Sequence, residues 1–420
     1  MAETEKNAIQ HSPIALTGFL LLITMLGVFP IDVILPSFQP IAKHLDTGPN
    51  NIALSVGYFV LAMAFSQLII GPLSDKLGRK RLLIWGLWVA LIGALGCLLT
   101  ERYALFVAFR VIQAFGCGCF VLTQPLVQDF FDNTRRNAAR IVQITASGLF
   151  ISVSPLIGSW LQSHFSWQSS FVVFIALTGM TLFAAQSLLE KDSTESSHSP
   201  SIVQSYAKLM LDKLFIRYSI LAALGFACHF SFIVASPLLF IKILHFTPYQ
   251  FSVAFIFYGM AYVTGGVAAT LINRRASSLA QLFLGVGLIA VAGAFIFVWH
   301  WIKQPSAPSL LLPMVLSTAG TCLCRCAATT CALECRPNEA GASSALLSAL
   351  VFAVGAIASG FLSRLHENLP VGLGAVFLLV ALTSLCLIGM IRRLSDGSGA
   401  QTSSCARLKV APGNFIPNDK

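Results

Sequence analysis

The stretch Gly71-Pro-Leu-Ser-Asp75-Lys-Leu-Gly78-Arg79-Lys80-Arg81 joins two apolar runs, at 51–72 and 82–99. Each run approaches or exceeds the roughly 20 apolar residues that a membrane-spanning helix needs. Basic residues after a span are an ordinary stop signal, and this explains the three consecutive cations. It does not explain Asp75, or the two glycines Gly71 and Gly78, which are seven residues apart. Glycine allows close helix contact, and an acid beside cations can join neighbouring helix ends through charge-assisted hydrogen bonds.

The composition of the whole chain also indicates a membrane protein. Of its 420 residues, 56% are hydrophobic and 10% are charged, and the mean hydropathy is +0.78. A soluble domain carries roughly 25% charged residues. Too few polar side chains remain to cover a water-facing surface, so we expect the excess apolar surface to contact the lipid bilayer. Most of the 11 cysteines fall inside apolar runs, as small buried hydrophobes rather than a disulfide framework.

Twelve apolar runs are long enough to span a membrane. They lie at 14–38, 51–72, 82–99, 103–127, 140–161, 169–189, 217–240, 250–271, 279–299, 309–333, 340–362 and 371–391. A polar stretch near the midpoint separates two blocks of six. The predicted domains are therefore a six-helix bundle at 1–189, a cytoplasmic linker at 190–216, a second bundle at 217–391 and a disordered tail at 392–420.

The basic residues give the topology, because cytoplasmic loops are enriched in Lys and Arg. With both termini cytoplasmic, the outer face receives only Lys43, Arg102, Lys242, Lys303 and Arg364. Arg110 and Arg325 fall inside spans, and the remaining twenty cations lie on the cytoplasmic face. This asymmetry predicts a multi-pass protein of the cytoplasmic (inner) membrane. It also explains the net charge of +10 without a nucleic-acid partner.

The stretch at 71–81 resembles the signature loop of the major facilitator superfamily. The resemblance covers the whole chain and implies an all-α fold of twelve transmembrane helices in two pseudo-symmetric six-helix halves. In that family the loop is a conformational latch at the cytoplasmic gate. The resemblance gives this role to Gly71, Asp75, Gly78, Arg79 and Lys80. It also pairs the latch with Asp129 at the cytoplasmic end of the fourth span, where an ordinary interfacial Asp is the alternative.

Asp32 and Arg110 are ionisable residues deep in predicted spans, where charges are costly and usually functional. Asp32 lies six residues before the outer end of its span, and Arg110 lies seven residues after the outer start of its own. Both depths are about 10 Å at 1.5 Å per residue. An acid that alternates between an Arg partner, water and a cationic substrate can couple proton release to transport. A purely structural Asp32–Arg110 pair is the alternative.

The sequence around these two residues resembles one branch of the twelve-span drug/proton antiporters, the bicyclomycin and chloramphenicol exporters. The matching stretches are Asp32-Val-Ile-Leu-Pro-Ser and Arg110-Val-Ile-Gln113-Ala-Phe-Gly116. In that branch the acid and the Arg serve coupling and binding. The fifth span is similar to the antiporter motif of drug exporters, with Gly148, Ser154, Pro155 and Gly158, although Ser154 replaces the usual Gly.

Further polar and aromatic residues are candidates for substrate binding. Arg110, Gln113, Cys117 and Gln124 recur at steps of three, four and seven, so they share one helical face, which we expect to border water. For Gln124, contact between helices is an equal alternative. Arg325 in the tenth span can bind an anionic group, and His229 in the seventh can relay protons or simply pack. Tyr58 and Tyr258 are aromatic candidates for lining an apolar pocket.

The sequence therefore predicts a proton-coupled exporter of drugs or related small molecules, acting as a monomer. No nucleotide-binding loop of the form Gly-x-x-x-x-Gly-Lys-Ser/Thr is present, which favours secondary transport. No enzyme constellation, cofactor site or metal site is predicted. Export of an endogenous metabolite such as a siderophore is a second hypothesis. A non-transporting membrane sensor is a third, against which the tail shows no recognisable signalling domain.

Overall fold

The computed structural model describes residues 13–131, 133–189, 202–273, 276–302, 306–336, 340–365 and 368–397. The regular elements of this part are all helical. The first of them are α1 (Pro13–Asp32), η1 (Leu35–Ser37), α2 (Phe38–His44), α3 (Pro49–Leu77), α4 (Arg79–Leu99), α5 (Tyr103–Cys117), η2 (Gly118–Leu122), α6 (Thr123–Phe130), α7 (Asn133–His164) and α8 (Ser169–Leu188). The others are α9 (Ile202–Leu211), α10 (Lys213–Pro237), η3 (Leu238–Ile243), α11 (Pro248–Asn273), α12 (Ser278–Ile302), α13 (Ala307–Cys335), α14 (Ala340–Ser363) and α15 (Leu369–Gly397).

Eleven stretches of the described chain are long and apolar enough to cross a membrane. Some combine several helices, such as Ile14–His44 and Tyr103–Val127. The remaining predicted span, 140–161, falls in α7, a helix of 32 residues whose first turns include side chains outside the described part. The predicted all-α membrane fold is confirmed.

The chain divides into two compact units. The first unit contains Met1–Ile202 and Ile233–Gly259, and the second contains Val203–Phe232 and Met260–Lys420. Each unit therefore takes part of α10 and part of α11. The division into bundles at 1–189 and 217–391 stays a prediction.

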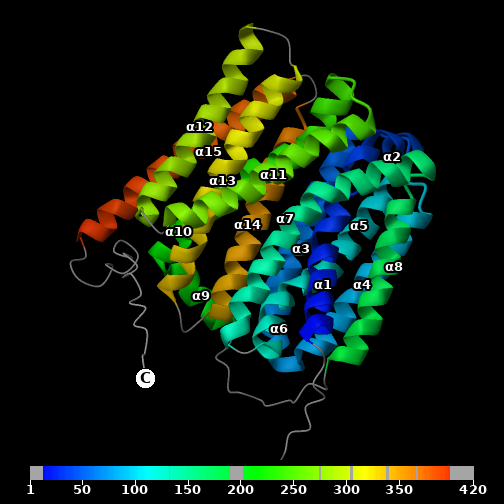
Figure 1. Ribbon diagram of the computed structural model, residues 1–420, viewed down its shortest axis with the longest axis horizontal. Coiled ribbons are helices and arrows are strands. Elements are labelled where there is room, and N and C mark those ends of the chain that lie inside the picture. The colour runs from blue at the N-terminus through cyan, green and yellow to red at the C-terminus, as the bar shows by residue number, and fades with distance from the viewer. Residues whose placement is uncertain are drawn as a thin grey trace, which may run out of the picture. The chain divides into compact units, whose positions relative to one another are not determined.

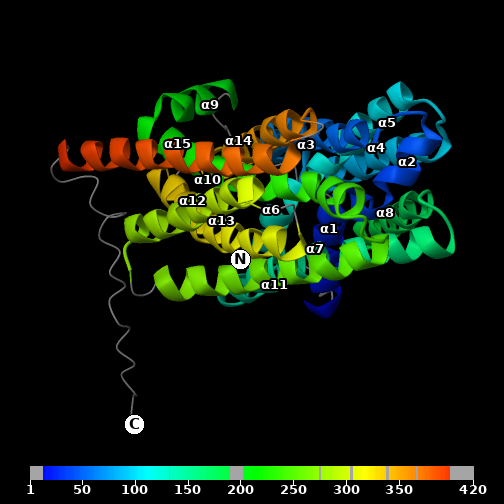
Figure 2. The ribbon, with the colours of Figure 1, turned by 90° about the horizontal axis from the view of Figure 1, so that it is seen from above.

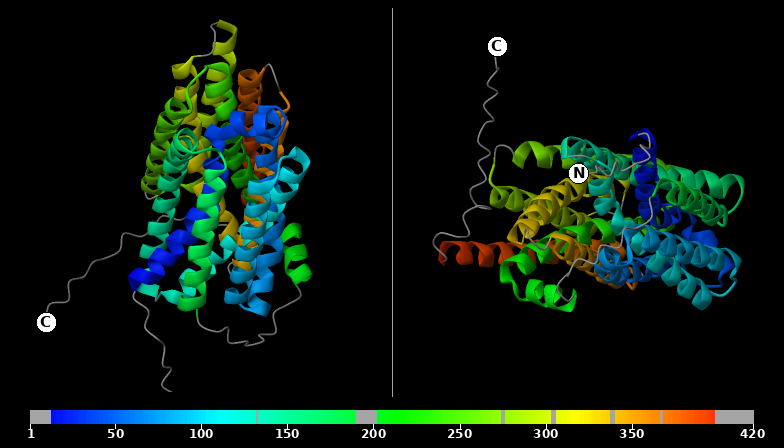
Figure 3. Two further views of the ribbon diagram at one scale, coloured as in Figure 1. Left: turned by 90° about the vertical axis from the view of Figure 1, so that its right-hand side faces the viewer. Right: turned by 90° about the horizontal axis from the view of Figure 1, so that it is seen from below.

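The two units repeat one pattern of neighbours. In the first, α4 packs between α5 and α8 (Figures 1 and 3). In the second, α12 packs between α13 and α15 (Figures 1 and 2). Glycines allow the helix backbones to meet: a Cβ on Gly116 would lie 2.2 Å from the Ala90 nitrogen, and one on Gly320 would lie 2.6 Å from the Gly285 carbonyl oxygen. The two units thus share one local arrangement of helices, as the internal repeats of transporters do.

Two predicted boundaries differ from the structure. The linker predicted at 190–216 contains the helix α9, whose apolar residues follow a helical period, although 190–201 lies outside the described residues. The last helix, α15, continues to Gly397, past the predicted end at 391. Residues 398–420 of the predicted tail also lie outside the described part.

Candidate functional site

Asp32 lies at a break in the first candidate span. Pro36 has no N–H and cannot donate to the Asp32 carbonyl, so α1 ends there and the chain passes through η1 into α2. The Asp32 side chain is 2% exposed. It has no hydrogen-bond or ion-pair partner in the described part of the chain. The break thus places a buried carboxyl group next to backbone that is not regular helix.

Arg110 binds the same region of α1. Its side chain is completely buried, with its guanidinium 4.1 Å from the centre of the Phe59 ring. One terminal nitrogen donates to the carbonyl of Pro30 at 3.1 Å, and the other donates to Gln113 Oε1 at 2.8 Å. The Asp32 and Arg110 side chains form no ion pair in this structure. Arg110 instead donates to the carbonyl of Pro30, which precedes Asp32 by two residues.

The polar group around Arg110 retains unused donors. Arg110 Nε and Gln113 Nε2 are buried, and neither has an acceptor in the described part of the chain. Leaving a buried donor unpaired costs about 1–3 kcal/mol. A water molecule or a polar group of a substrate would remove this cost, so the two donors are suitable ligand-binding groups.

The predicted polar face does not continue unbroken along the fourth span. Cys117 is buried at the end of α5. The chain then forms the 3₁₀ segment η2, which turns every three residues rather than 3.6 and shifts the angular position of the next helix. Gln124 comes after this change, in α6, and its side chain lies outside the described part. The expectation of one shared face assumed a regular α-helix.

The segment of α7 predicted to be an antiporter motif packs against the break in α1. A Cβ on Gly158 would lie 2.0 Å from the carbonyl oxygen of Val33, the residue after Asp32. Pro155 is buried, and its carbonyl accepts a hydrogen bond of 2.8 Å from Ser252 of α11. The other two motif residues, Gly148 and Ser154, are also buried. Only a residue without a side chain fits at the contact with Val33.

The predicted latch begins at a conformation that favours glycine. Gly78 joins α3 to α4 with φ 92° and ψ 144°, in a region that residues with a Cβ rarely adopt. It thereby ends α3 and allows α4 to start immediately at Arg79. Gly71, seven residues earlier, lies within α3 and is partly exposed.

The cations of the latch bind the ends of two other helices. Arg79 donates to the Pro125 carbonyl of α6 at 3.1 Å, near the end of the fourth candidate span. Lys80 donates to the carbonyls of Gln186, at 3.1 Å, and Leu189. It thus supplies donors where the last carbonyls of α8 lack helical partners. The side chains of Asp75 and Asp129 lie outside the described residues, so their predicted pairing stays a prediction.

The two tyrosine candidates lie in different surroundings. Tyr58 on α3 is 38% exposed, whereas Tyr258 on α11 is completely buried, with its ring centre 5.0 Å from that of Phe255. Tyr258 is therefore part of a packed aromatic cluster. Tyr58 is the more accessible of the two.

In the second unit, Arg325 and His229 lie in one aromatic cluster. The Arg325 guanidinium is 4.9 Å from the centre of the Phe226 ring, and His229 packs between Phe226, at 5.6 Å, and Tyr262, at 5.2 Å. His229 is 6% exposed, whereas Arg325 is partly exposed. Two nearby thiols contact backbone carbonyls: Cys322 that of Tyr262 and Cys324 that of Leu221. Among the described residues, no three His, Cys, Asp or Glu side chains are placed to hold a metal ion.

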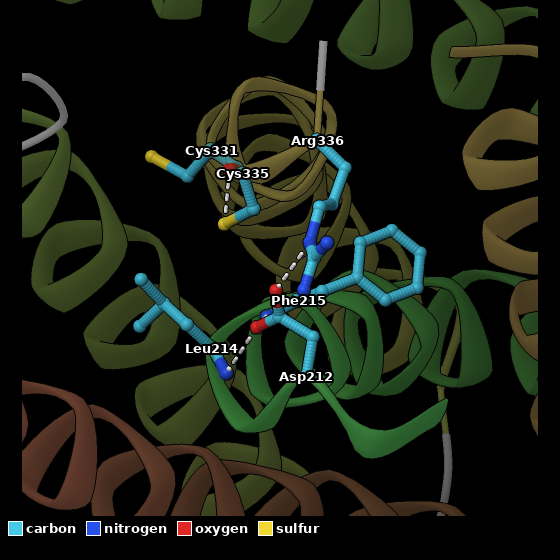
Figure 4. Close-up of polar contacts among 6 residues, drawn as sticks. All are labelled: Asp212, Leu214, Phe215, Cys331, Cys335 and Arg336. Carbon is cyan, nitrogen blue, oxygen red and sulfur yellow. Dashed lines mark hydrogen bonds and ion pairs between the residues drawn. The ribbon is translucent and has the colours of Figure 1, made fainter. Parts of the chain in front are cut away.

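A polar joint at the start of α10 was not predicted from the sequence. Asp212 Oδ1 accepts hydrogen bonds of 3.1 Å from the N–H groups of Leu214 and Phe215 and so caps the helix, while Oδ2 pairs with Arg336 at 2.9 Å (Figure 4). Burial raises the pKa of Asp212, but the hydrogen bonds from Arg336, Phe215 and Leu214 outweigh it, and the net effect is a lowered pKa. An Asp immediately before an apolar helix is a typical N-cap, so the cap was predictable. The partner Arg336, from the end of α13, was not.

Comparison with curated proteins shows relatives along almost the whole chain. It is 26% identical over 396 residues to an uncharacterized MFS-type transporter, YdgK, of Bacillus subtilis, covering 91% of this chain and 98% of that protein. It is 28% identical over 365 residues to a bicyclomycin resistance protein homolog of Haemophilus influenzae, covering 83% and 88%. It is 25% identical over 374 residues to the multidrug resistance protein D of Escherichia coli, covering 88% and 93%.

Solved structures share the fold. The xylose transporter XylE of E. coli, in a partially occluded inward-open conformation, superposes with a TM-score of 0.68 at 13% identity, covering 89% of this chain and 97% of that one. A D-xylose–proton symporter gives the same TM-score at 16% identity, covering 88% and 97%. The sequence profile of the Major Facilitator Superfamily matches residues 19–360. Together with the helical fold and the internal repeat, this match shows that the chain is a membrane transporter of the major facilitator superfamily.

Proposed function

We propose that this transporter exports drugs or related small molecules across the cytoplasmic membrane in exchange for protons, by alternating access. Both termini are cytoplasmic in this proposal, and one chain suffices. Two of the relatives are named for resistance to bicyclomycin or to multiple drugs, which supports export over uptake. The resemblance of the Asp32 and Arg110 segments to the drug/proton antiporters points the same way.

The observation that carries the proposal is the isolated carboxyl group of Asp32. It is the only Asp or Glu in the predicted spans of the first half, it is buried, and it has no partner in the described part of the chain. A carboxyl group in such a place is stable when neutral and becomes reactive toward protons or cations when water enters. Exchange of a proton for a substrate at one carboxyl group is the minimum chemistry that an antiporter needs.

Arg110 has a supporting role in this proposal. It is tied to Pro30 and Gln113 and leaves Arg110 Nε and Gln113 Nε2 without acceptors in the described part of the chain. These donors can bind the polar groups of a substrate while Asp32 changes its protonation state. Lys80 and Arg79 hold the ends of α8 and α6, and the proposal assigns them to the cytoplasmic gate that closes and opens during the cycle.

The test is drug-dependent proton movement in proteoliposomes. Purified protein is reconstituted with a pH-sensitive dye inside the vesicles, and bicyclomycin or ethidium is added against a proton gradient. We expect drug-driven proton flux in the wild type and its loss, by more than tenfold, in Asp32→Asn. Asp46→Asn is the matched control, because Asp46 is exposed and has φ 48°, a conformation that Asn tolerates. Unchanged proton coupling in Asp32→Asn would show that the assigned role is wrong.

An alternative within transport is export of an endogenous metabolite such as a siderophore. The partly exposed cation Arg325 favours it, because many metabolites carry anionic groups. Drug-susceptibility and metabolite-secretion profiles of cells with and without the protein distinguish the two substrates. Accumulation of a metabolite inside cells that lack the protein, with unchanged drug susceptibility, would favour the alternative.

A further inference from the structure

We propose that the cluster around Arg325 is a subsite for the carboxylate of a planar aromatic organic anion. The subsite rests on the proposed transport function and narrows its substrate class. It is made by Arg325, Phe226, Tyr262 and His229 of the second unit, which bring together a cation, two aromatic rings and an imidazole.

In the second half of the chain, the sequence gives Arg325 no acid to pair with inside the membrane. No Asp or Glu occurs between Asp212 and Glu334, and the candidate spans Gly341–Ser363 and Leu369–Arg393 contain none. Glu334 lies nine residues after Arg325, about 13 Å along the helix axis. Asp212 is engaged with Arg336. In the described part of the second unit, the positive charge of Arg325 therefore has no neutralising carboxylate.

Arg325 lies well inside the candidate span formed by α13. It lies ten residues before Cys335, the last residue of α13, which is about 15 Å of helix. Its side chain is nevertheless partly exposed. Contact between a guanidinium and lipid tails is costly, so we expect this exposed part to face water or a polar ligand.

The surrounding helices hold the cation in a fixed position. A Cβ on Gly225 would lie 3.3 Å from Arg325 Cγ, so the stem of the Arg rests on the glycine of α10. Thr321 donates to the Gly225 carbonyl at 3.1 Å and fixes α13 against α10. The Tyr262 side chain lies near the guanidinium. The donors of Arg325 are thus oriented before any ligand arrives, which reduces the entropy lost on binding.

The aromatic part of the subsite is equally fixed. The Phe226 ring stacks on Phe230, with 5.6 Å between centres and 12° between planes, and meets Phe352 edge-on at 5.2 Å. Phe226 supports the guanidinium, and Tyr262 and His229 continue the aromatic surface beside it. A planar ring that carries a carboxylate fits both the cation and the aromatic surface. The carboxylate accepts hydrogen bonds from Arg325, and the ring packs on the aromatic side chains.

The experiment measures binding rather than transport, so it is independent of proton coupling. Full-length protein in detergent is titrated with three probes that share one ring system: 1-naphthoate, 1-naphthamide and 1-naphthylmethylammonium. We expect naphthoate to bind at least tenfold more tightly than naphthamide. In Arg325→Gln this preference should disappear, while binding of the ammonium probe should stay within twofold of wild type.

Two further variants separate charge from packing. Arg325→Lys keeps the charge and should retain part of the preference for naphthoate, and Phe226→Leu should weaken all three probes. Arg393→Gln, an exposed cation near the end of α15, is the control and should change nothing.

The subsite is refuted if wild type does not prefer naphthoate, or if Arg325→Gln preserves the preference. The wild-type comparison of naphthoate with naphthamide remains decisive even where Arg325→Gln proves unstable. Because the preference is read without proton flux, it can hold where the Asp32→Asn test fails, and the converse is also true. Failure of the subsite and failure of the export proposal are therefore distinguishable.

Discussion

The guanidinium of Arg110 is hydrogen-bonded to the carbonyl of Pro30, at 3.1 Å, and not to the carboxylate of Asp32. A bond to either group would place Arg110 at the depth of Asp32, as the sequence predicts. The carbonyl bond leaves Asp32 without a counter-ion in the described part of the chain and gives the Arg a partner whose charge does not change. Protonation of Asp32 therefore need not break the contact that holds α5 against α1.

Replacement of Arg110 should weaken the contact between α5 and α1. In Arg110→Met, the Pro30 carbonyl and Gln113 Oε1 lose their donor, and each unsatisfied buried acceptor costs about 1–3 kcal/mol. We expect a fall in melting temperature of several degrees in detergent and a loss of drug-dependent proton flux. Arg102→Gln, at an exposed position before α5, should leave both measurements unchanged. A normal melting temperature for Arg110→Met would contradict the structural role of this side chain.

Substitution of Gly78 should loosen the latch. With φ 92° and ψ 144°, an alanine there is strained by about 1–3 kcal/mol, and the strain would displace Arg79 and Lys80 from the helix ends that they bind. We expect Gly78→Ala to reduce the transport rate at least fivefold. Gly48→Ala is the control, because Gly48 has φ −88° and no heavy atom within 4 Å of an added Cβ. Equal rates in the two variants would show that the backbone conformation at Gly78 does not matter.

Gly158 should be intolerant of any side chain. The carbonyl oxygen of Val33 lies 2.0 Å from the position of an added Cβ, and backbone cannot move aside as a flexible side chain can. In Gly158→Ala, α7 must separate from the break in α1, and we expect transport to be lost while the protein still inserts into the membrane. Gly179→Ala on α8, where an added Cβ meets nothing within 4 Å, should transport normally. Normal transport by both variants would mean that the close contact is not needed.

The Asp212 joint should give stability a pH dependence. Because the folded state lowers the pKa of Asp212, the joint stabilises the protein above the unfolded pKa and loses this contribution as the pH falls through the folded value. Removal of an N-cap costs about 1 kcal/mol, so Asp212→Ala should melt at a lower temperature than wild type at pH 7. The gap should narrow as the pH falls below the unfolded pKa of about 3.9.

Asp212→Asn separates the two functions of this residue. Asn is as good an N-cap as Asp but carries no charge for Arg336. We expect a smaller loss of stability at pH 7 than in Asp212→Ala, and melting temperatures of the two variants are the measurement. If the two variants melt at the same temperature, the ion pair rather than the cap supplies the stability.

Much of the fold was predictable because its signals are local. A run of about 20 apolar residues indicates a spanning helix by itself. The break at Asp32 was within reach too, since Pro36 stands four residues later and removes a helical hydrogen bond. The 3₁₀ segment at 118–122 was not, because it depends on packing: a Cβ on Gly118 would lie 2.2 Å from Ser66 Oγ. The predicted polar face of the fourth span assumed a regular α-helix at that point.

The candidate site was predictable in its residue types but not in its contacts. Asp32, Arg110 and Arg325 stood out because charges in spans are rare. The contacts of the two arginines include a backbone carbonyl in one case and an aromatic ring in the other, and neither has a sequence signal of its own. Lys80 illustrates the same limit, because its acceptors are backbone groups at the end of α8, more than a hundred residues away.

Asp212 is also a mechanical joint. A pull on the chain that precedes α9 reaches α10 through this residue, and the cap and the ion pair with Arg336 resist it together. While these contacts are intact, the start of α10 and the end of α13 stay connected through Asp212. One side chain therefore couples the chain that enters α10 to the end of α13.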